Sequence, residues 1–226
     1  MSHHYTPRGP VGRFANGLEE NLIAILLGLM TVLTFVNVIL RYAFQSSLMW
    51  GLETVLVLFS WLVLIGASYA VKVNSHLGVD AIVNLLPPAG RRILALVAGA
   101  VCIIYAALLL KGAYDYWAPF AGFQQTGGRW FPTGFVETRD RAFYTTDQIP
   151  MPGFLGWMGD VFNMGEPYDK LPRFIPYFAL PLGVALLLYR LIQAVWQIWT
   201  GEREGLIVSH EAEDAIEELR HQKREG

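Results

Sequence analysis

Residues 22–40 read LIAILLGLMTVLTFVNVIL, a stretch of 19 residues without a charged side chain. At ~1.5 Å of rise per residue, a helix of this length covers about 28 Å, close to the ~30 Å hydrocarbon core of a bilayer. Lipid offers no hydrogen bonds, so a spanning segment must satisfy its own backbone groups, as a helix does. The stretch therefore predicts a membrane-spanning helix.

Three further stretches have the same character. Residues 54–71 and 93–110 carry no charge, and residues 174–199 carry only Arg190. The composition agrees, because 54% of the residues are hydrophobic and only 16% are charged, against about a quarter in an average soluble domain. We expect an all-α integral membrane protein with four transmembrane helices, at about residues 19–43, 50–71, 92–112 and 173–199.

The lysines and arginines of the short connectors predict the orientation of these helices. Residues 44–49 carry none, whereas residues 72–92 carry Lys72, Arg91 and Arg92. Both ends of the chain carry lysine or arginine as well. The N-terminus (1–18), the connector 72–92 and a charged tail (200–226) are therefore expected in the cytoplasm, and a long loop (113–172) is expected outside.

The connectors differ in character. Residues 72–92 combine an apolar face with Pro87 and Pro88, which fits a short interfacial helix that ends at the prolines. His76 and Asp80 stand four apart, a spacing that suits a metal, but no third ligand is near, so a polar interfacial turn is the preferred interpretation. The 113–172 loop is rich in aromatics and glycine, which favours a folded loop resting on the membrane surface or on a partner. The tail from Ser209 has the pattern of a solvated helix.

Chemical motifs are missing from this sequence. None of the five histidines lies in a predicted span, so axial haem ligation is not expected, and no nucleotide-binding, hydrolase or zinc-protease motif appears. The net charge of −2 gives no basic face for nucleic acid, and Cys102, in an apolar run, is expected to be a packing residue. Charges stand near the ends of the spans, whereas an ion or substrate path needs them inside. We expect neither an enzyme nor a carrier that works alone, with no cofactor and no metal.

The first two spans resemble a known family. The features that carry the likeness are an ordered set, RYxF, WxxE, FxWL, GA, HLGVD and LPP, within residues 41–88. The set resembles the DctQ-type small permease subunit of tripartite ATP-independent periplasmic (TRAP) transporters, and the likeness covers about residues 19–95. One departure is Leu52, where the family often has an acid before Glu53. The long outer loop is similar to that of the C4-dicarboxylate type.

The resemblance implies a scaffold role. Such a subunit sits in the bacterial inner membrane with a large multi-span permease subunit, which carries the solute by an elevator movement driven by a sodium gradient. A periplasmic solute-binding protein delivers the solute, and the small subunit offers part of the docking surface. An anchor subunit of a redox or other multi-subunit membrane complex is the alternative, and it would need cofactor ligands in its spans. A small channel is a further alternative, with only Asn37, Ser60 and Ser68 as polar candidates.

Nine residues are predicted to have structural or subunit-interface roles: Arg41, Trp50, Glu53, Trp61, His76, Asp80, Arg91, Arg92 and Arg190. Arg190 is expected near the cytoplasmic headgroups, where its long side chain would extend to water as an anchor. Arg41 and Glu53 flank a short connector, so their side chains reach similar depth. They are predicted to form an ion pair, and the alternative is that both extend separately to the membrane surface.

Overall fold

The computed structural model describes residues 9–73, 87–132, 134–136 and 141–201. Four of its helices are long and apolar enough to cross a membrane. They are α1 (Gly9–Ala43), α2 (Met49–Lys72), α3 (Pro88–Trp117) and the last helix α6 (Ala179–Thr200), which follows the short α5 (Phe174–Tyr177). The prediction of a mainly helical protein with four transmembrane helices is confirmed. The proposed interfacial helix and the tail helix lie outside the described residues.

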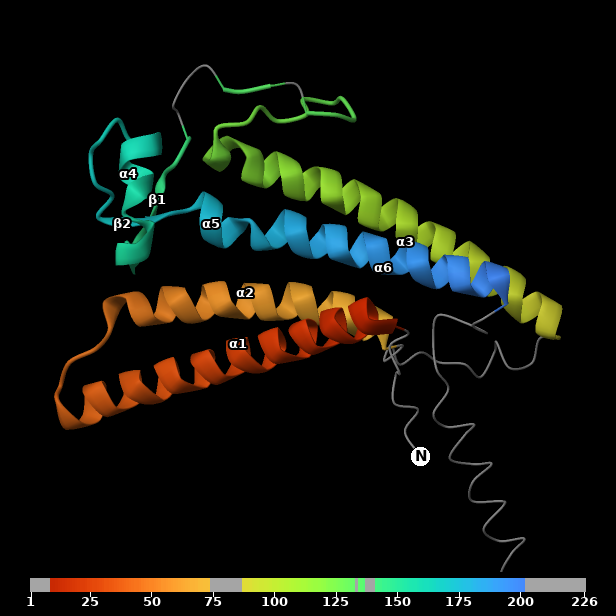
Figure 1. Cartoon of the computed structure of the whole chain (residues 1–226), viewed down its shortest axis with the longest axis horizontal. Coiled ribbons are helices and arrows are strands. Elements are labelled where there is room, and N and C mark those ends of the chain that lie inside the picture. Colours follow the sequence, from red (N-terminus) through yellow and green to blue (C-terminus); the bar gives the residue numbers. More distant parts are fainter. Residues whose placement is uncertain (1–8, 74–86, 133, 137–140, 202–226) are drawn as a thin grey trace, which may run out of the picture.

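The four long helices pack in the order α1, α2, α6, α3, so the last of these four lies between the second and the third. In Figure 1, α1 and α2 form one antiparallel hairpin, and α6 runs between α2 and α3. The buried residues of α6 include Ala179, Gly183 and Ala194, which are small enough to let neighbouring backbones approach. Helix α1 packs chiefly against α2 and leaves most of its apolar surface exposed.

Gly183 marks the closest approach between α2 and α6. A Cβ atom added there would lie 2.4 Å from Cβ of Leu64, far inside van der Waals contact. We expect Gly183→Ala to separate the two helices and to destabilise the chain by about 1–3 kcal/mol, as other overpacking substitutions do. The measurement is the thermal midpoint of the purified chain in detergent.

The control for this prediction is Gly66→Ala, because a Cβ atom at Gly66 would meet nothing within 4 Å. Combining Leu64→Gly with Gly183→Ala should cost less than the sum of the two single substitutions, since Leu64→Gly removes the Cβ atom that clashes. An equal loss for Gly66→Ala and Gly183→Ala would contradict the close packing of α2 on α6.

The segment between α3 and α5, residues 118–173, forms a folded cap at one end of the bundle. It contains two 3-10 turns, η2 (Ala118–Ala121) and η3 (Gly153–Leu155), and the short helix α4 (Trp157–Phe162). Strands β1 (Thr145–Pro150) and β2 (Lys170–Pro172) pair antiparallel, with Thr145 opposite Pro172 and Pro150 opposite Lys170. This small sheet was not predicted. We call the end of the bundle that carries the cap the cap end, and the opposite end the termini end (Figure 1).

Aromatic rings hold the cap on the ends of α3 and α5. Helix α3 continues to Trp117, one turn beyond the end expected from the sequence, and the Trp117 indole donates to the carbonyl of Phe174 at 2.8 Å. The Phe143 ring stacks on Phe162 at 4.6 Å between centroids and meets Phe174 edge-on. These contacts pack the cap directly against the ends of the transmembrane helices, in geometries that aromatic pairs prefer.

Candidate functional site

Glu19 of α1 is the centre of an ion network at the termini end. Its Oε2 lies 2.6 Å from Nζ of Lys72 on α2, and its Oε1 accepts from the guanidinium of Arg190 on α6. The Lys72 side chain is only 4% exposed and that of Arg190 is 12% exposed. One carboxylate therefore pairs with two buried bases and ties three helices together.

A second layer of polar contacts surrounds this network. Glu20 accepts from the hydroxyl of Tyr69 at 2.6 Å and from the amide of Asn16 at 2.7 Å. Arg190 also donates to Oε1 of Gln193 at 3.0 Å, while its buried Nε finds no partner within the described residues. The expectation that Arg190 extends to the headgroups as a plain anchor is thus wrong, because its guanidinium turns into the bundle toward Glu19.

Glu53 forms the corresponding site at the cap end. Its carboxylate stands on the first turns of α2 and accepts backbone N–H groups from three consecutive residues of β1: Asp147 at 3.0 Å, Gln148 at 2.6 Å and Ile149 at 3.2 Å. Three successive N–H groups that converge on one anion form a strong local binding site for a carboxylate. Glu53 therefore fastens β1 to the end of α2.

Arg173 holds the other side of the same strand. Its Nε donates to the carbonyl of Thr145 at 2.8 Å, its Nη2 lies 2.6 Å from the Asp147 carboxylate, and its own N–H donates to Tyr144 at 2.6 Å. Lys170 adds a bond to the Asp147 carbonyl. Strand β1 is thus held between α2 and the residue that precedes α5. We call Glu53, β1 and Arg173 the cap clamp.

The predicted ion pair between Arg41 and Glu53 does not form. Glu53 is occupied by the N–H groups of β1, and Arg41, in the last turn of α1, is exposed and makes no ion pair among the described residues. The polar contact that closes the α1–α2 hairpin is instead Oδ1 of Asn37, which accepts the N–H of Leu48 at 3.0 Å. This bond satisfies a backbone donor just before α2.

The remaining predicted residues are spread over the molecule. Trp50 and Trp61 are half-buried on α2. Arg91 is half-buried at the start of α3, and Arg92 beside it donates to the carbonyl of Trp199 on α6. His76 and Asp80 lie outside the described residues. Glu53, Arg92 and Arg190 each make a side-chain contact with another element of the structure.

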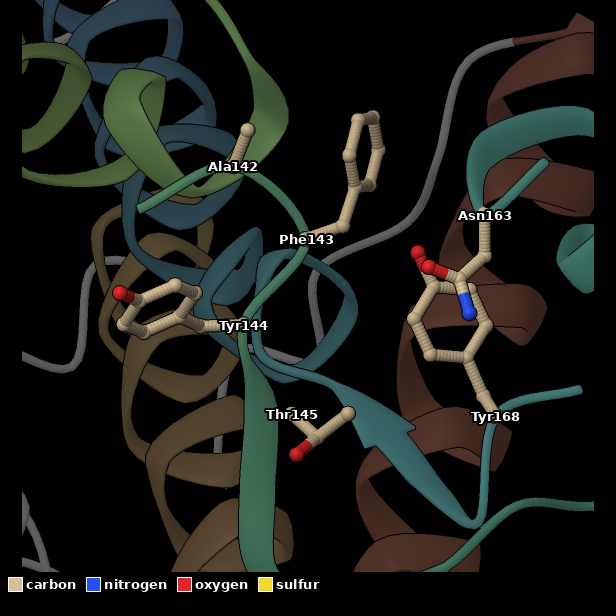
Figure 2. A pocket seen from close by; sticks show the side chains of 6 residues that line it. All are labelled: Ala142, Phe143, Tyr144, Thr145, Asn163 and Tyr168. Carbon is tan, nitrogen blue, oxygen red and sulfur yellow. The ribbon is translucent and has the colours of Figure 1, made fainter. Parts of the chain in front are cut away.

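The cap carries an open depression of about 410 Å³, lined by Ala142, Phe143, Tyr144, Thr145, Asn163 and Tyr168. Figure 2 shows Asn163 and Tyr168 on one side of it and Tyr144 and Thr145 on the other. Phe143 has a positive φ of 59°, which is unusual for a residue with a side chain. The lining residues include no acid, base or thiol among those described, so we assign no chemistry to this depression.

Several residues of the two sites were missed from the sequence. Glu19 lies at the edge of the first apolar run, and the topology alone places it at the same end of the bundle as Lys72 and Arg190. One acid and two bases at the same end of the bundle indicate an ion pair, so this contact could have been predicted from the sequence. Arg173 and the N–H groups of β1 gave no comparable signal, because a strand inside a long loop has no apolar periodicity to reveal it.

Comparison with known proteins agrees with the resemblance seen in the sequence motifs. Residues 30–136 match the family described as "Tripartite ATP-independent periplasmic transporters, DctQ component". The chain is 46% identical over 216 residues, 96% of its length and 86% of the relative's, to the C4-dicarboxylate TRAP transporter small permease protein DctQ of Vibrio cholerae.

Proteins of the same name are more distant relatives in two other bacteria. That of Pseudomonas aeruginosa is 28% identical over 91% of this chain and 94% of its own length. That of Rhodobacter capsulatus is 25% identical over 81% of this chain and 77% of its own length. The four apolar helices and the similarity along nearly the whole chain agree: this protein belongs to the DctQ family, the small membrane subunits of tripartite ATP-independent periplasmic transporters.

Proposed function

We propose that this chain is the fixed membrane subunit of a bacterial C4-dicarboxylate uptake system driven by an ion gradient. It would stand in the inner membrane beside a large multi-span permease subunit that carries the solute, with both termini in the cytoplasm and the cap in the periplasm. The name of the relative from Vibrio cholerae, which includes C4-dicarboxylate, supports the solute class. The lysine and arginine bias of the connectors supports the orientation.

The observation that carries the scaffold role is the use of charge. Among the described residues, the charged side chains of the spans gather at the two ends of the bundle, where they join its elements together. A carrier needs polar groups along a path through the membrane. A rigid support needs helices that are fixed to one another at both ends, with an apolar surface between the two ends. This chain has both features.

Helix α1 is the surface that we assign to the large subunit. Six exposed apolar side chains on α1 recur at spacings of three and four, the spacing at which one helix packs along another: Leu22, Ile25, Leu29, Val32, Val36 and Ile39. Because α1 packs chiefly on α2, this seam is open along its length. The interface roles of Arg41, Trp50 and Trp61 stay predictions.

The cap is the surface that we assign to a solute-binding protein. Phe154, Trp157, Val161 and Met164 are all more than half exposed and follow a helical spacing through α4. Exposed apolar side chains in such a row are typical of a protein-binding surface. The cap clamp fixes their position relative to the membrane helices, as a docking surface requires.

The test is uptake of radiolabelled succinate into proteoliposomes that contain this chain, the large subunit and the binding protein. We expect no uptake when either membrane subunit is omitted. Replacing Phe154 and Trp157 by serine should lower uptake about tenfold at low binding-protein concentration, the effect of losing one or two kcal/mol at an interface. Uptake should recover at high concentration.

The matched control for the cap surface replaces Trp130 and Phe131, two exposed aromatics elsewhere in the cap, by serine. It should leave the dependence on binding-protein concentration unchanged. Uptake by the large subunit without this chain would end the scaffold proposal. An unchanged concentration dependence in the Phe154 and Trp157 variant would remove the docking role alone.

A further inference from the structure

A small hairpin follows α3 and makes no use of the cap clamp. The chain turns at Gly122, with φ of 75°, and Phe123 then pairs antiparallel with Phe135. The N–H of Gln124 donates to the carbonyl of Gly134, and that of Val136 to the carbonyl of Gly122, both at 2.9 Å. The tip turns at Gly127 and Gly128, which both have positive φ and are closed by a bond from Arg129 N–H to Thr126 at 2.9 Å. We call residues 122–132 and 134–136 the aromatic hairpin.

The aromatic hairpin folds back along α3. Oδ1 of Asp115 accepts the N–H of Thr126 at 2.6 Å, and Oδ2 accepts its hydroxyl at 2.7 Å. Gln125 donates to the carbonyl of Asp115 at 2.8 Å. Thr126 is therefore fixed beside a residue that precedes the end of α3 at Trp117. Figure 1 shows the hairpin turned from the end of α3 back toward the middle of that helix.

This direction sets the depth of the tip in a bilayer. The uncharged run of α3 ends at Leu110, and Asp115 follows five residues later, about 7.5 Å further along the axis. The headgroup layer on each side of the hydrocarbon core is about 5–8 Å thick. Thr126 thus lies near the outer edge of that layer, and the tip beyond it returns toward the hydrocarbon core.

The tip presents side chains that suit this layer. Trp130 is 70% exposed and Phe131 is 79% exposed, and Arg129 beside them is exposed as well. Tryptophan concentrates at membrane–water interfaces because its ring is both apolar and a hydrogen-bond donor, and an arginine there meets lipid phosphate.

We propose that the aromatic hairpin is a membrane-surface anchor whose tip, with Trp130 and Phe131, inserts among the phospholipid headgroups of the leaflet on the cap side. The bilayer is favoured as the occupant because the hairpin continues the exposed flank of α3. The α3 side chains Tyr105, Leu108 and Leu109 belong to a membrane-spanning segment and are open to lipid. The inference does not depend on the proposed transport function.

The test is spin-label accessibility in the full chain, reconstituted in nanodiscs that contain phosphatidylglycerol. The exposed Cys102 is first replaced by alanine, and a nitroxide is then attached in a Phe131→Cys variant. We expect collisions with oxygen to dominate over collisions with a water-soluble nickel chelate. A Met164→Cys variant is the matched control, because Met164 is 83% exposed on the far part of the cap and should show the reverse.

Two results would overturn the proposal. Strong collisions with the nickel chelate at position 131 would place the tip in water, and weak collisions with both reagents would place it against protein. A second measurement avoids labelling altogether. The fluorescence of Trp130 is obtained by subtracting the emission of a Trp130→Phe variant from that of the parent chain. Lipids brominated near the headgroup should quench this difference. An unquenched difference spectrum would also overturn the anchor.

Discussion

Replacing Glu19 by glutamine is expected to lower the thermal midpoint of the purified chain by on the order of 10 °C. The substitution removes the carboxylate that pairs with both Lys72 and Arg190, whose side chains are 4% and 12% exposed. Removing one partner of a buried ion pair costs about 3–5 kcal/mol, since the remaining charge is neither solvated nor paired. Unfolding in mild detergent, followed by tryptophan fluorescence, measures the change.

The design of this experiment separates charge from packing. Glu20→Gln is the matched control, because Glu20 is the neighbouring acid of α1 and accepts from Tyr69 and Asn16. Adding Arg190→Gln to Glu19→Gln removes one unpaired charge and should recover part of the stability. If Glu19→Gln costs no more than Glu20→Gln, the network does not hold the three helices.

Replacing Glu53 by glutamine is expected to release the cap from α2. The glutamine amide offers one acceptor oxygen and brings its own donors against the N–H groups of β1, where the carboxylate accepted three. Hydrogen bonds to a charged group contribute about 1.5–3 kcal/mol each, and solvent near this half-buried site reduces the sum. A net loss of about 3 kcal/mol would speed hydrogen exchange at residues 147–149 by roughly a hundredfold.

Two variants calibrate the Glu53 result. Asp160→Asn removes an exposed acid of α4 and should leave the exchange of β1 unchanged. Arg173→Gln should loosen the same strand from its other side, through the loss of its bonds to Thr145 and Asp147. Exchange at residues 147–149 that stays at the parent rate in Glu53→Gln would show that the carboxylate does not fasten the strand.

The transmembrane part of the fold was accessible from the sequence because lipid imposes one rule on every span. Uncharged runs such as residues 22–40 and 93–110 lie within observed helices. The cap was less accessible, since its sheet is held by bonds between residues far apart in the chain. The bond from the Gln148 N–H to the Glu53 carboxylate is one example, and the local sequence of neither segment predicts it.

The same limit explains the two corrections at charged residues. Arg190 and Glu53 were singled out as costly charges near span ends, because the cost of a charge follows from its position alone. Their partners follow from the packing order of the helices, which places α6 beside α2. Once that order is known, Glu19 is the acid within reach of Arg190, and β1 is the chain segment over the start of α2.

The position of α6 between α2 and α3 has a consequence for biogenesis. The ribosome makes α6 last, yet it is the helix on which both α2 and α3 pack. The α1–α2 hairpin can close early and pair Glu19 with Lys72, but α3 must wait in the bilayer until the cap and α6 have been synthesised. Nascent chains that stop before α6 should therefore be substrates for membrane quality control, and the arrival of Arg190 at Glu19 completes the assembly.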